Sequence, residues 1–296
     1  MIARIALTHR RAVVLMVFCA FLWSTAGVVT RLLESAHSFE VTFWRSFFTV
    51  LSLLVILPLV RGRAVFTQMR HAGRTLWLSG VCWSVMFTAY MVALTMTTVA
   101  NVLVTLALGP LFTALMARLF TGDRVAAHTW WAISLAGVGI VWMYGGQADI
   151  SAQWAGTLVA LLVPVAAACN WTVVQHSQAH GHKVDLVPAV LVGAVISCLS
   201  TLPLAWPLAA TAHDVSLLGL LGALQLAIPC VLSVWCASIL KAPEMALLAM
   251  LEVVFGTLLA WVGAGEVPGT SVLYGGTLVV TALVINEWIS WSQPRP

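Results

Sequence analysis

Charge is scarce in this sequence. Asp, Glu, Lys and Arg together make up 8% of the 296 residues, whereas hydrophobic residues make up 61%. A soluble domain carries about 25% charged residues, so this chain cannot cover a surface that faces water, and its composition predicts a protein embedded in a lipid bilayer. The net charge of +4 is small and dispersed along the chain, which argues against a nucleic-acid partner.

Sequence motifs of several common chemistries are absent too. The chain has no Walker A pattern, no HExxH and no GxSxG, which argues against ATP-driven work and against metal-dependent or serine hydrolysis. Its six cysteines lie in apolar runs without a CxxC pair. We therefore expect thiols that pack as small hydrophobic groups, with no disulfide and no bound metal. No cofactor and no enzymatic activity are expected.

Long apolar runs, in contrast, are abundant. A helix that crosses the bilayer needs roughly 20 apolar residues, and the chain supplies ten such segments. Their ranges are 12–33, 40–60, 75–95, 99–120, 128–145, 154–178, 187–208, 215–240, 243–262 and 270–291. No soluble domain or long linker remains between them. The predicted class is therefore an all-α integral membrane protein with ten transmembrane helices.

Basic residues give the orientation of these helices. With the N-terminus inside, all but two of the 14 Lys and Arg residues fall in cytoplasmic segments, as the positive-inside rule requires. They are Arg4, Arg10, Arg11, Arg61, Arg63, Arg70, Arg74, Arg118, Arg124, Lys183, Lys241 and Arg295. Arg31 lies on the opposite side, and Arg45 lies within the second helix. An even number of helices places both termini in the cytoplasm, and we expect the cell's inner membrane as the location.

The two halves of the chain resemble each other. LGPLFTALMARLFTGD (108–123) aligns without gaps with LEVVFGTLLAWVGAGE (251–266), at a constant offset of 143 residues. Each half then holds five helices, and an odd number forces the second copy to insert upside down. Inverted repeats of this kind are typical of secondary transporters, whose substrate site lies near the membrane midplane between the halves.

These motifs resemble those of a known family. FLWSTAGVVTRL in the first helix, Arg45, Pro110 followed by TGD, and LEVVFGTLLAWVGAGE are similar to the pattern of ten-helix EamA-type members of the drug/metabolite transporter superfamily. The resemblance implies a first five-helix repeat over 12–146 and a second, inverted repeat over 154–291. Within the superfamily the chain looks most like the YddG-type exporters of aromatic and other hydrophobic amino acids. Val253 departs from the family pattern, which has a proline after the glutamate.

Glu252 and Arg45 are charged residues inside predicted membrane helices. A charge at the centre of the bilayer costs on the order of 3 kcal/mol, so both side chains should face the protein interior. Glu252 either binds a substrate ammonium group or a coupling proton, or it makes a structural helix–helix hydrogen bond. Arg45 either binds a substrate carboxylate or holds backbone carbonyl groups. We favour a gating or structural role for Arg45, Pro110 and Gly256, because proline kinks helices and glycine lets them approach.

Further polar and aromatic residues are candidates for lining a substrate cavity. A tyrosine hydroxyl needs a partner and an asparagine is costly in lipid, so both residue types should face inward. The predicted substrate-binding set is Trp23, Tyr90, Asn101, Asn170, Trp171, Gln175, Trp235 and Glu252. The histidines between 176 and 182 are expected to be solvated near the cytoplasmic surface rather than to bind metal.

The resemblance and these residues together predict a secondary transporter. It exports aromatic and other hydrophobic amino acids, or similar small amphipathic metabolites, by alternating access through a central cavity between the repeats. The alternative is a proton-coupled exporter of cationic drugs or of another metabolite, such as a sugar or nucleotide-sugar. An intramembrane enzyme lacks the motifs, and a channel would need a filter-like polar loop or a ring of charge. The expected partners are the small-molecule substrate and the bilayer, and we expect a monomer.

Overall fold

The computed structural model of the chain is helical. It describes residues 8–30, 32–36, 38–71, 73–96, 102, 105–106, 108–122, 125–144, 154–179, 185–264 and 269–292. Within these ranges there is no β-strand. The all-α class predicted from the sequence is confirmed for this part of the chain.

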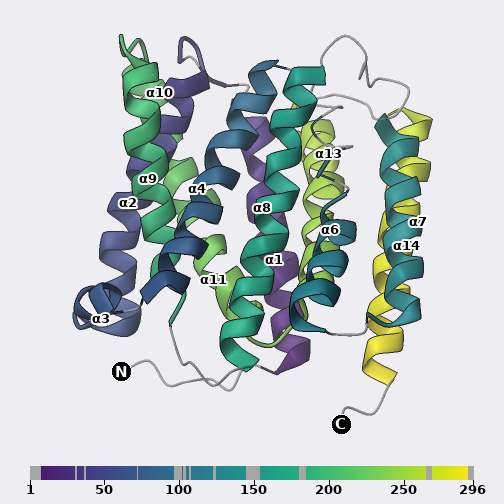
Figure 1. Ribbon diagram of the computed structural model, residues 1–296. Helices are drawn as coiled ribbons and strands as arrows, with labels where there is room; N and C mark the ends of the chain where they lie inside the picture. The colour runs from purple at the N-terminus through teal and green to yellow at the C-terminus, as the bar shows by residue number, and fades with distance from the viewer. Residues whose placement is uncertain are drawn as a thin grey trace.

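Helices occupy most of the first half of the chain. They are α1 (His9–Thr30), α2 (Ser38–Arg61), α3 (Val65–His71), α4 (Gly73–Met96), α6 (Gly109–Met116) with its π-helical extension η1 (Ala117–Thr121), and α7 (Ala127–Tyr144). The short α3 was not predicted. It follows the positive-φ turn at Gly62 and lies at the same end of the molecule as the end of α2 (Figure 1).

Helices also occupy most of the second half. Its helices are α8 (Trp154–Ala179), α9 (Pro188–Ala205), α10 (Ala212–Leu220) continued by the π-helical η3 (Leu221–Ala227) and α11 (Ile228–Cys236), α12 (Ala242–Ala249), α13 (Leu251–Ala264) and α14 (Thr270–Ser292). The beginning of α1 and the end of α14 lie at the same end of the molecule, the lower end in Figure 1.

Several helices have the length and composition of membrane spans. Five stretches in the described residues are long and apolar enough to cross a bilayer: Phe39–Arg61, Gly73–Ala93, Ala155–Ser177, Pro188–Ala205 and Ala212–Cys236. Large apolar side chains also cover the outer surface, among them Leu59, Trp131 and Val262. Such a surface is costly in water and matches the hydrocarbon of a membrane.

Helix packing brings distant segments together. Helix α4 packs on α8 and α9, α2 packs on α9 and η3, and α1 packs on α11 and α13. Helices α7 and α14 pack on each other at one side of the bundle (Figure 1). Every one of these pairs joins a helix of the first half to a helix of the second half, so the halves are interleaved rather than separate.

Glycines allow the closest of these contacts. A Cβ atom placed on Gly222 of η3 would lie 2.6 Å from the Arg45 carbonyl oxygen and 2.9 Å from the Thr49 backbone nitrogen. A Cβ atom on Gly193 of α9 would lie 2.4 Å from Cβ of Trp83. Since no real side chain tolerates such distances, the backbones of these helices touch where glycine stands, as in other tightly packed membrane helices.

Two predicted helices are irregular in the structure. The range 215–240 contains η3, in which the Ile228 backbone nitrogen donates to the Ala223 carbonyl oxygen, five residues earlier. Pro229 follows directly, and because proline has no N–H, the regular helical ladder is interrupted at this point. The range 243–262 is divided at Met250, whose nitrogen bonds Leu247, three residues back. Neither interruption was predicted.

Two buried carboxylates hold the upper end of the bundle together. Asp214 of α10 accepts hydrogen bonds from the backbone nitrogens of Glu34, Ser35 and Ala36, at 2.8, 3.1 and 3.2 Å. From the opposite side, Glu40 of α2 accepts hydrogen bonds from the backbone nitrogens of Ala209 and Ala210 in the loop before α10. We call this arrangement the upper clasp. It joins the α1–α2 loop to the α9–α10 loop.

Side chains also join the helices at the lower end. His9 at the start of α1 bonds Glu244 in the first turn of α12. The guanidinium of Arg61, at the end of α2, forms an ion pair with Asp185, 2.8 Å between Nε and Oδ2. We call these two pairs the lower clasp.

Candidate functional site

Arg45 is the central cation of the site. Its side chain projects from α2 and is 3% exposed. One terminal nitrogen, Nη2, donates to the Phe87 carbonyl oxygen of α4 at 3.0 Å. The Nε–H has no hydrogen-bond partner among the residues that the structure describes. A buried guanidinium therefore has one donor in use on a backbone carbonyl and another that is available to a ligand.

Glu252 and Tyr90 lie within electrostatic range of Arg45 and of each other. Glu252 lies in the first turn of α13, where the positive end of the helix dipole stabilises a carboxylate. Both side chains retain accessible surface, although Val253 and Ala89 beside them are buried. The structure thus brings together an acid, a base and a phenol from three helices.

Trp23 and Cys230 complete this group from α1 and α11. The Trp23 side chain lies within hydrogen-bonding reach of the Cys230 sulfur, and Cys230 lies within electrostatic reach of Arg45 and Glu252. The Trp23 carbonyl oxygen accepts a hydrogen bond from Nε2 of Gln225, at 3.2 Å. We refer to Trp23, Arg45, Tyr90, Cys230 and Glu252 as the central cluster.

Asn170 and Trp171 occupy the interface between α8 and α4. Asn170 is 0% exposed, and its Oδ1 accepts from the hydroxyl of Ser79 at 2.6 Å. Its Nδ2 has no hydrogen-bond partner within the described part of the chain. Trp171 is 4% exposed and packs edge-on against Trp83, with ring centroids 5.7 Å apart. In this conformation both predicted residues are enclosed by protein, so contact with a substrate requires the α4–α8 interface to open.

Gln175 and Trp235 lie with the lower clasp. The Gln175 side-chain oxygen accepts from the backbone nitrogen of Ala242, the first residue of α12, at 3.2 Å. The Arg61 guanidinium lies over the Trp235 ring, 5.7 Å from its centroid. Both residues therefore contact the groups that hold the lower ends of the helices together.

The residues predicted as structural are found at helix contacts. Pro110 is buried in the first turn of α6, and a Cβ atom on the preceding Gly109 would lie 3.7 Å from Cβ of Pro164 in α8. Gly256 of α13 faces Ser24 of α1, and a Cβ atom on Gly256 would lie 3.9 Å from Cβ of Ser24. Asn101 lies outside the described residues.

Three residues of the site were missed by the sequence analysis. Ser79, Gln225 and Cys230 are buried partners of Asn170, Trp23 and Arg45, respectively. Gln225 had a usable signal, because it is a lone amide in the apolar run LLGALQLAIP. The other two are small residues that are common in membrane helices, and nothing in their local sequence distinguishes them.

One group of potential metal ligands occurs among the described residues. Glu34, His213 and Asp214 offer ligand atoms within 4.8 Å of one another. The oxygens of Asp214, however, already accept several backbone N–H groups in the upper clasp. We therefore assign Asp214 to loop positioning rather than to metal binding.

A helical bundle of apolar spans that encloses opposite charges is typical of membrane transporters. Comparisons with known proteins agree. Residues 10–145 match the EamA-like transporter family. Over 279 residues the chain is 24% identical to the pseudopaline exporter CntI of Pseudomonas aeruginosa, found in two strains, and the alignment covers 93% of this chain and 95% of that protein.

The fold has also been seen experimentally. A crystal structure described only as that of a protein superposes with a TM-score of 0.79 and 17% identity, over 97% of this chain and 100% of that chain. This likeness concerns the fold alone. The family match and the apolar helices together make the chain a membrane protein, and they favour a transporter over an enzyme.

Proposed function

We propose that the chain is a ten-helix EamA-type transporter of the inner membrane that exports a small zwitterionic metabolite by alternating access. The observation that carries this proposal is the central cluster, in which buried Arg45 has an unpartnered Nε and lies within electrostatic reach of Glu252. The favoured cargo is an amino acid with an aromatic or other hydrophobic side chain, or a similar amphipathic metabolite.

The topology of the described helices supports ten spans. A described helix overlaps each of the ten predicted ranges, and the start of α1 and the end of α14 lie at the same end of the bundle (Figure 1). An even number of crossings gives this result. Since Arg61, Arg63 and Arg74 lie near the lower end, the positive-inside rule assigns that end to the cytoplasm.

Contacts at the clasps support the inversion of the second repeat. The beginning of α1 and the end of α8 both bond the first turn of α12, through His9 and Gln175. Likewise, Arg61 at the end of α2 pairs with Asp185 just before α9 begins. Helices that correspond in the two repeats therefore run in opposite directions, which is the geometry expected of an inverted repeat.

Helix packing supports the same repeat. We pair α1 with α8, α2 with α9, α4 with α10–η3–α11, α6 with α12–α13, and α7 with α14. Under this exchange the α2–α9 and α7–α14 contacts map onto themselves, α4–α8 maps onto α11–α1, and α6–α8 maps onto α13–α1. The closest glycine contacts correspond as well: Gly222 touches Arg45 and Thr49, while Gly80, near the matching position, touches Ala189 and Val192.

The central cluster suits a zwitterion better than a cation. Glu252 provides a carboxylate for an ammonium group, and Nε of Arg45 provides a charge-assisted donor for a carboxylate. Trp23 and Tyr90 offer aromatic surface for the side chain between them. The relative's role as a pseudopaline exporter supports export of a small metabolite. Transport of a zwitterionic cargo leaves the buried charges balanced, which limits the electrostatic cost of the bound state.

The second candidate is a proton-coupled exporter of cationic drugs. It is favoured by one observation, the accessible surface that Glu252 retains next to aromatic residues. In that case Glu252 would exchange a proton for the cation, and Arg45 would be structural.

Transport into proteoliposomes distinguishes the two candidates. The panel contains radiolabelled aromatic and aliphatic amino acids, a cationic dye and a sugar, each with and without an imposed pH gradient. Wild type is compared with Glu252→Gln and with Ser200→Ala, which removes an exposed hydroxyl outside the central cluster and serves as the control. We expect amino-acid transport that falls more than tenfold in Glu252→Gln only. Transport of the dye alone, dependent on the gradient and lost in Glu252→Gln, would establish the drug exporter instead.

A further inference from the structure

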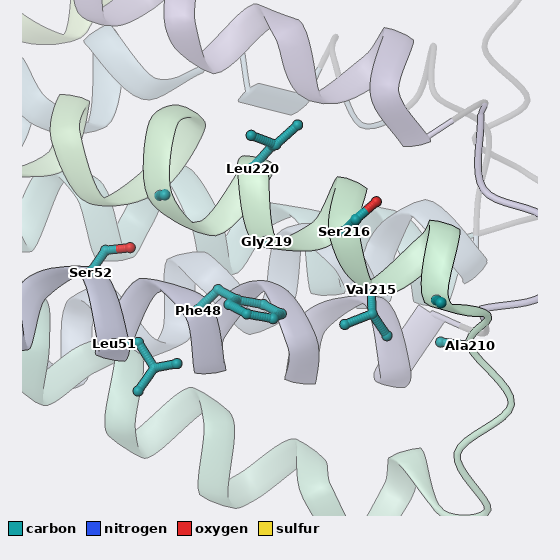
Figure 2. Close-up of a pocket in the computed structure, with 10 residues that line it drawn as sticks. Phe48, Leu51, Ser52, Ala210, Val215, Ser216, Gly219 and Leu220 are labelled. Atoms are coloured by element: carbon teal, nitrogen blue, oxygen red, sulfur yellow. The ribbon is translucent and has the colours of Figure 1, made fainter.

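A groove between α2 and α10 is separate from the central cluster. It has a volume of about 630 Å³ and opens to the outside of the bundle. Its lining residues come from two elements and from the loop before α10: Phe48, Leu51, Ser52, Ala210, Val215, Ser216, Gly219 and Leu220 (Figure 2). Both helices belong to stretches long and apolar enough to cross a membrane. The groove therefore opens toward lipid.

The groove exists because a glycine faces a phenylalanine. Gly219 has no side chain, and a Cβ atom there would be 3.6 Å from the Phe48 ring. Figure 2 shows the Phe48 ring lying between α2 and α10. Ser216 and Leu220, on the same helix, are exposed. The result is a mostly apolar groove that an acyl chain could occupy.

The upper mouth of the groove is polar. Ala210 and Ala212 line this part, and the hydroxyl of Thr211 between them donates to Oε2 of Glu34 at 3.4 Å. The Glu34 side chain is 61% exposed and the His213 side chain 53% exposed, with 3.9 Å between His213 Nδ1 and Glu34 Oε1. An exposed carboxylate and an imidazole therefore lie side by side where the apolar groove ends.

We propose that this groove binds one phospholipid whose headgroup carries a primary ammonium group, as in phosphatidylethanolamine. One acyl chain lies along Phe48 and Leu220, the ammonium group donates to Glu34, and His213 donates to the phosphate. A choline headgroup has no N–H to donate and loses the hydrogen bond to Glu34. The proposal depends on the membrane location of α2 and α10 and not on the transported substrate.

Native mass spectrometry of the full chain in detergent tests the site. The protein is given equal amounts of phosphatidylethanolamine and phosphatidylcholine with identical acyl chains. We expect about a tenfold preference for phosphatidylethanolamine, the size expected for one charge-assisted hydrogen bond. Glu34→Gln, which removes the charge of the acceptor, should reduce this preference, and Ser216→Trp, which fills the groove, should lose the bound lipid.

Ser200→Trp is the matched control for Ser216→Trp. Both serines are exposed, and each hydroxyl donates to the carbonyl oxygen three residues earlier, His213 for Ser216 and Ser197 for Ser200. Equal retention of the two lipids by the wild type would overturn the proposal, and so would a preference for anionic phosphatidylglycerol. Unchanged lipid binding in Ser216→Trp would do the same. If Ser216→Trp fails to fold, the loop variant Glu34→Gln decides the question.

Discussion

Arg45 can act structurally, by holding a backbone carbonyl through one donor, or bind the substrate carboxylate through the donor that has no partner among the described residues. Lys in its place keeps the charge but loses the planar fork that binds a carboxylate through two nitrogens. We expect wild type to transport an amino acid about tenfold faster than its methyl ester, a difference of roughly 1.4 kcal/mol. Arg45→Lys should abolish this preference, as measured by competitive uptake into proteoliposomes.

The ester comparison excludes a purely structural explanation. If Arg45 only held the Phe87 carbonyl, Arg45→Lys would lower the amount of folded protein and slow both substrates alike. An unchanged preference for the free acid in Arg45→Lys would therefore assign the residue to the fold.

Ser79 has a positioning effect on Asn170. Its hydroxyl is the donor to Oδ1 of the fully buried amide, so Ser79→Ala leaves that oxygen unsatisfied and should cost about 1–3 kcal/mol of unfolding free energy. Adding Asn170→Leu to Ser79→Ala should recover part of this loss, because the orphaned amide is removed. Thermal unfolding in detergent measures both steps, with Ser200→Ala as an exposed control. Additive losses would contradict the proposed pairing.

At this scale the sequence predicted residue types better than partners. Glu252, Asn170 and Arg45 could be predicted as interior residues because each is polar or charged in an apolar helix. The partners depend on how each helix is rotated about its axis. That rotation is set by packing between distant segments, which explains why Ser79 and Cys230 were missed.

Among the helices, the contact of η3 with α2 is the tightest that glycine provides near the central cluster. A methyl group on Gly222 would collide with the Arg45 carbonyl oxygen, at 2.6 Å, and with Cβ of Phe48, at 2.7 Å. Backbone atoms cannot move aside as a flexible side chain can, so Gly222→Ala should cost about 1–3 kcal/mol. It should also move Arg45 and so reduce transport.

Gly256→Ala is the matched comparison for Gly222→Ala. Its Cβ would have an ordinary contact of 3.9 Å to Ser24, and alanine favours the helix by about 1 kcal/mol over glycine. We expect the unfolding temperature to stay the same or to rise in this variant. Equal destabilisation of both variants would show that the α2–η3 contact is not special.

Helix ranges were predictable, whereas helix irregularities were not. Apolar run length gave ranges that described helices overlap in every case. At Met250 a backbone N–H bonds the carbonyl three residues earlier, and at the end of η3 it bonds the carbonyl five residues earlier, instead of the usual four. Pro229 is a signal for the second. At Met250 no proline or glycine marks the change, and the bonding pattern had to come from the structure.

For the whole molecule, alternating access requires that the two ends open in turn. Here both ends are joined, the upper by Ser35, Asp214 and Glu40 and the lower by the His9–Glu244 and Arg61–Asp185 pairs. The clasps connect the first half of the chain to the second. If the repeats rock against each other, each clasp must break once in every transport cycle.

Cross-linking tests this requirement directly. The double variant Ser35→Cys/Ala209→Cys places two thiols across the upper clasp, where Ser35 Oγ donates to the Ala209 carbonyl oxygen at 2.7 Å. The double variant His9→Cys/Glu244→Cys places two thiols across the lower clasp. A short, cleavable thiol cross-linker should reduce transport more than tenfold in either variant, and reduction of the linker should restore it. Single-cysteine variants treated with the same cross-linker show whether its reaction with the native thiols, which are buried or partly buried, affects transport. Full transport with one end locked would mean that the substrate reaches that side between other helices, and that the clasp fixes the fold without gating it.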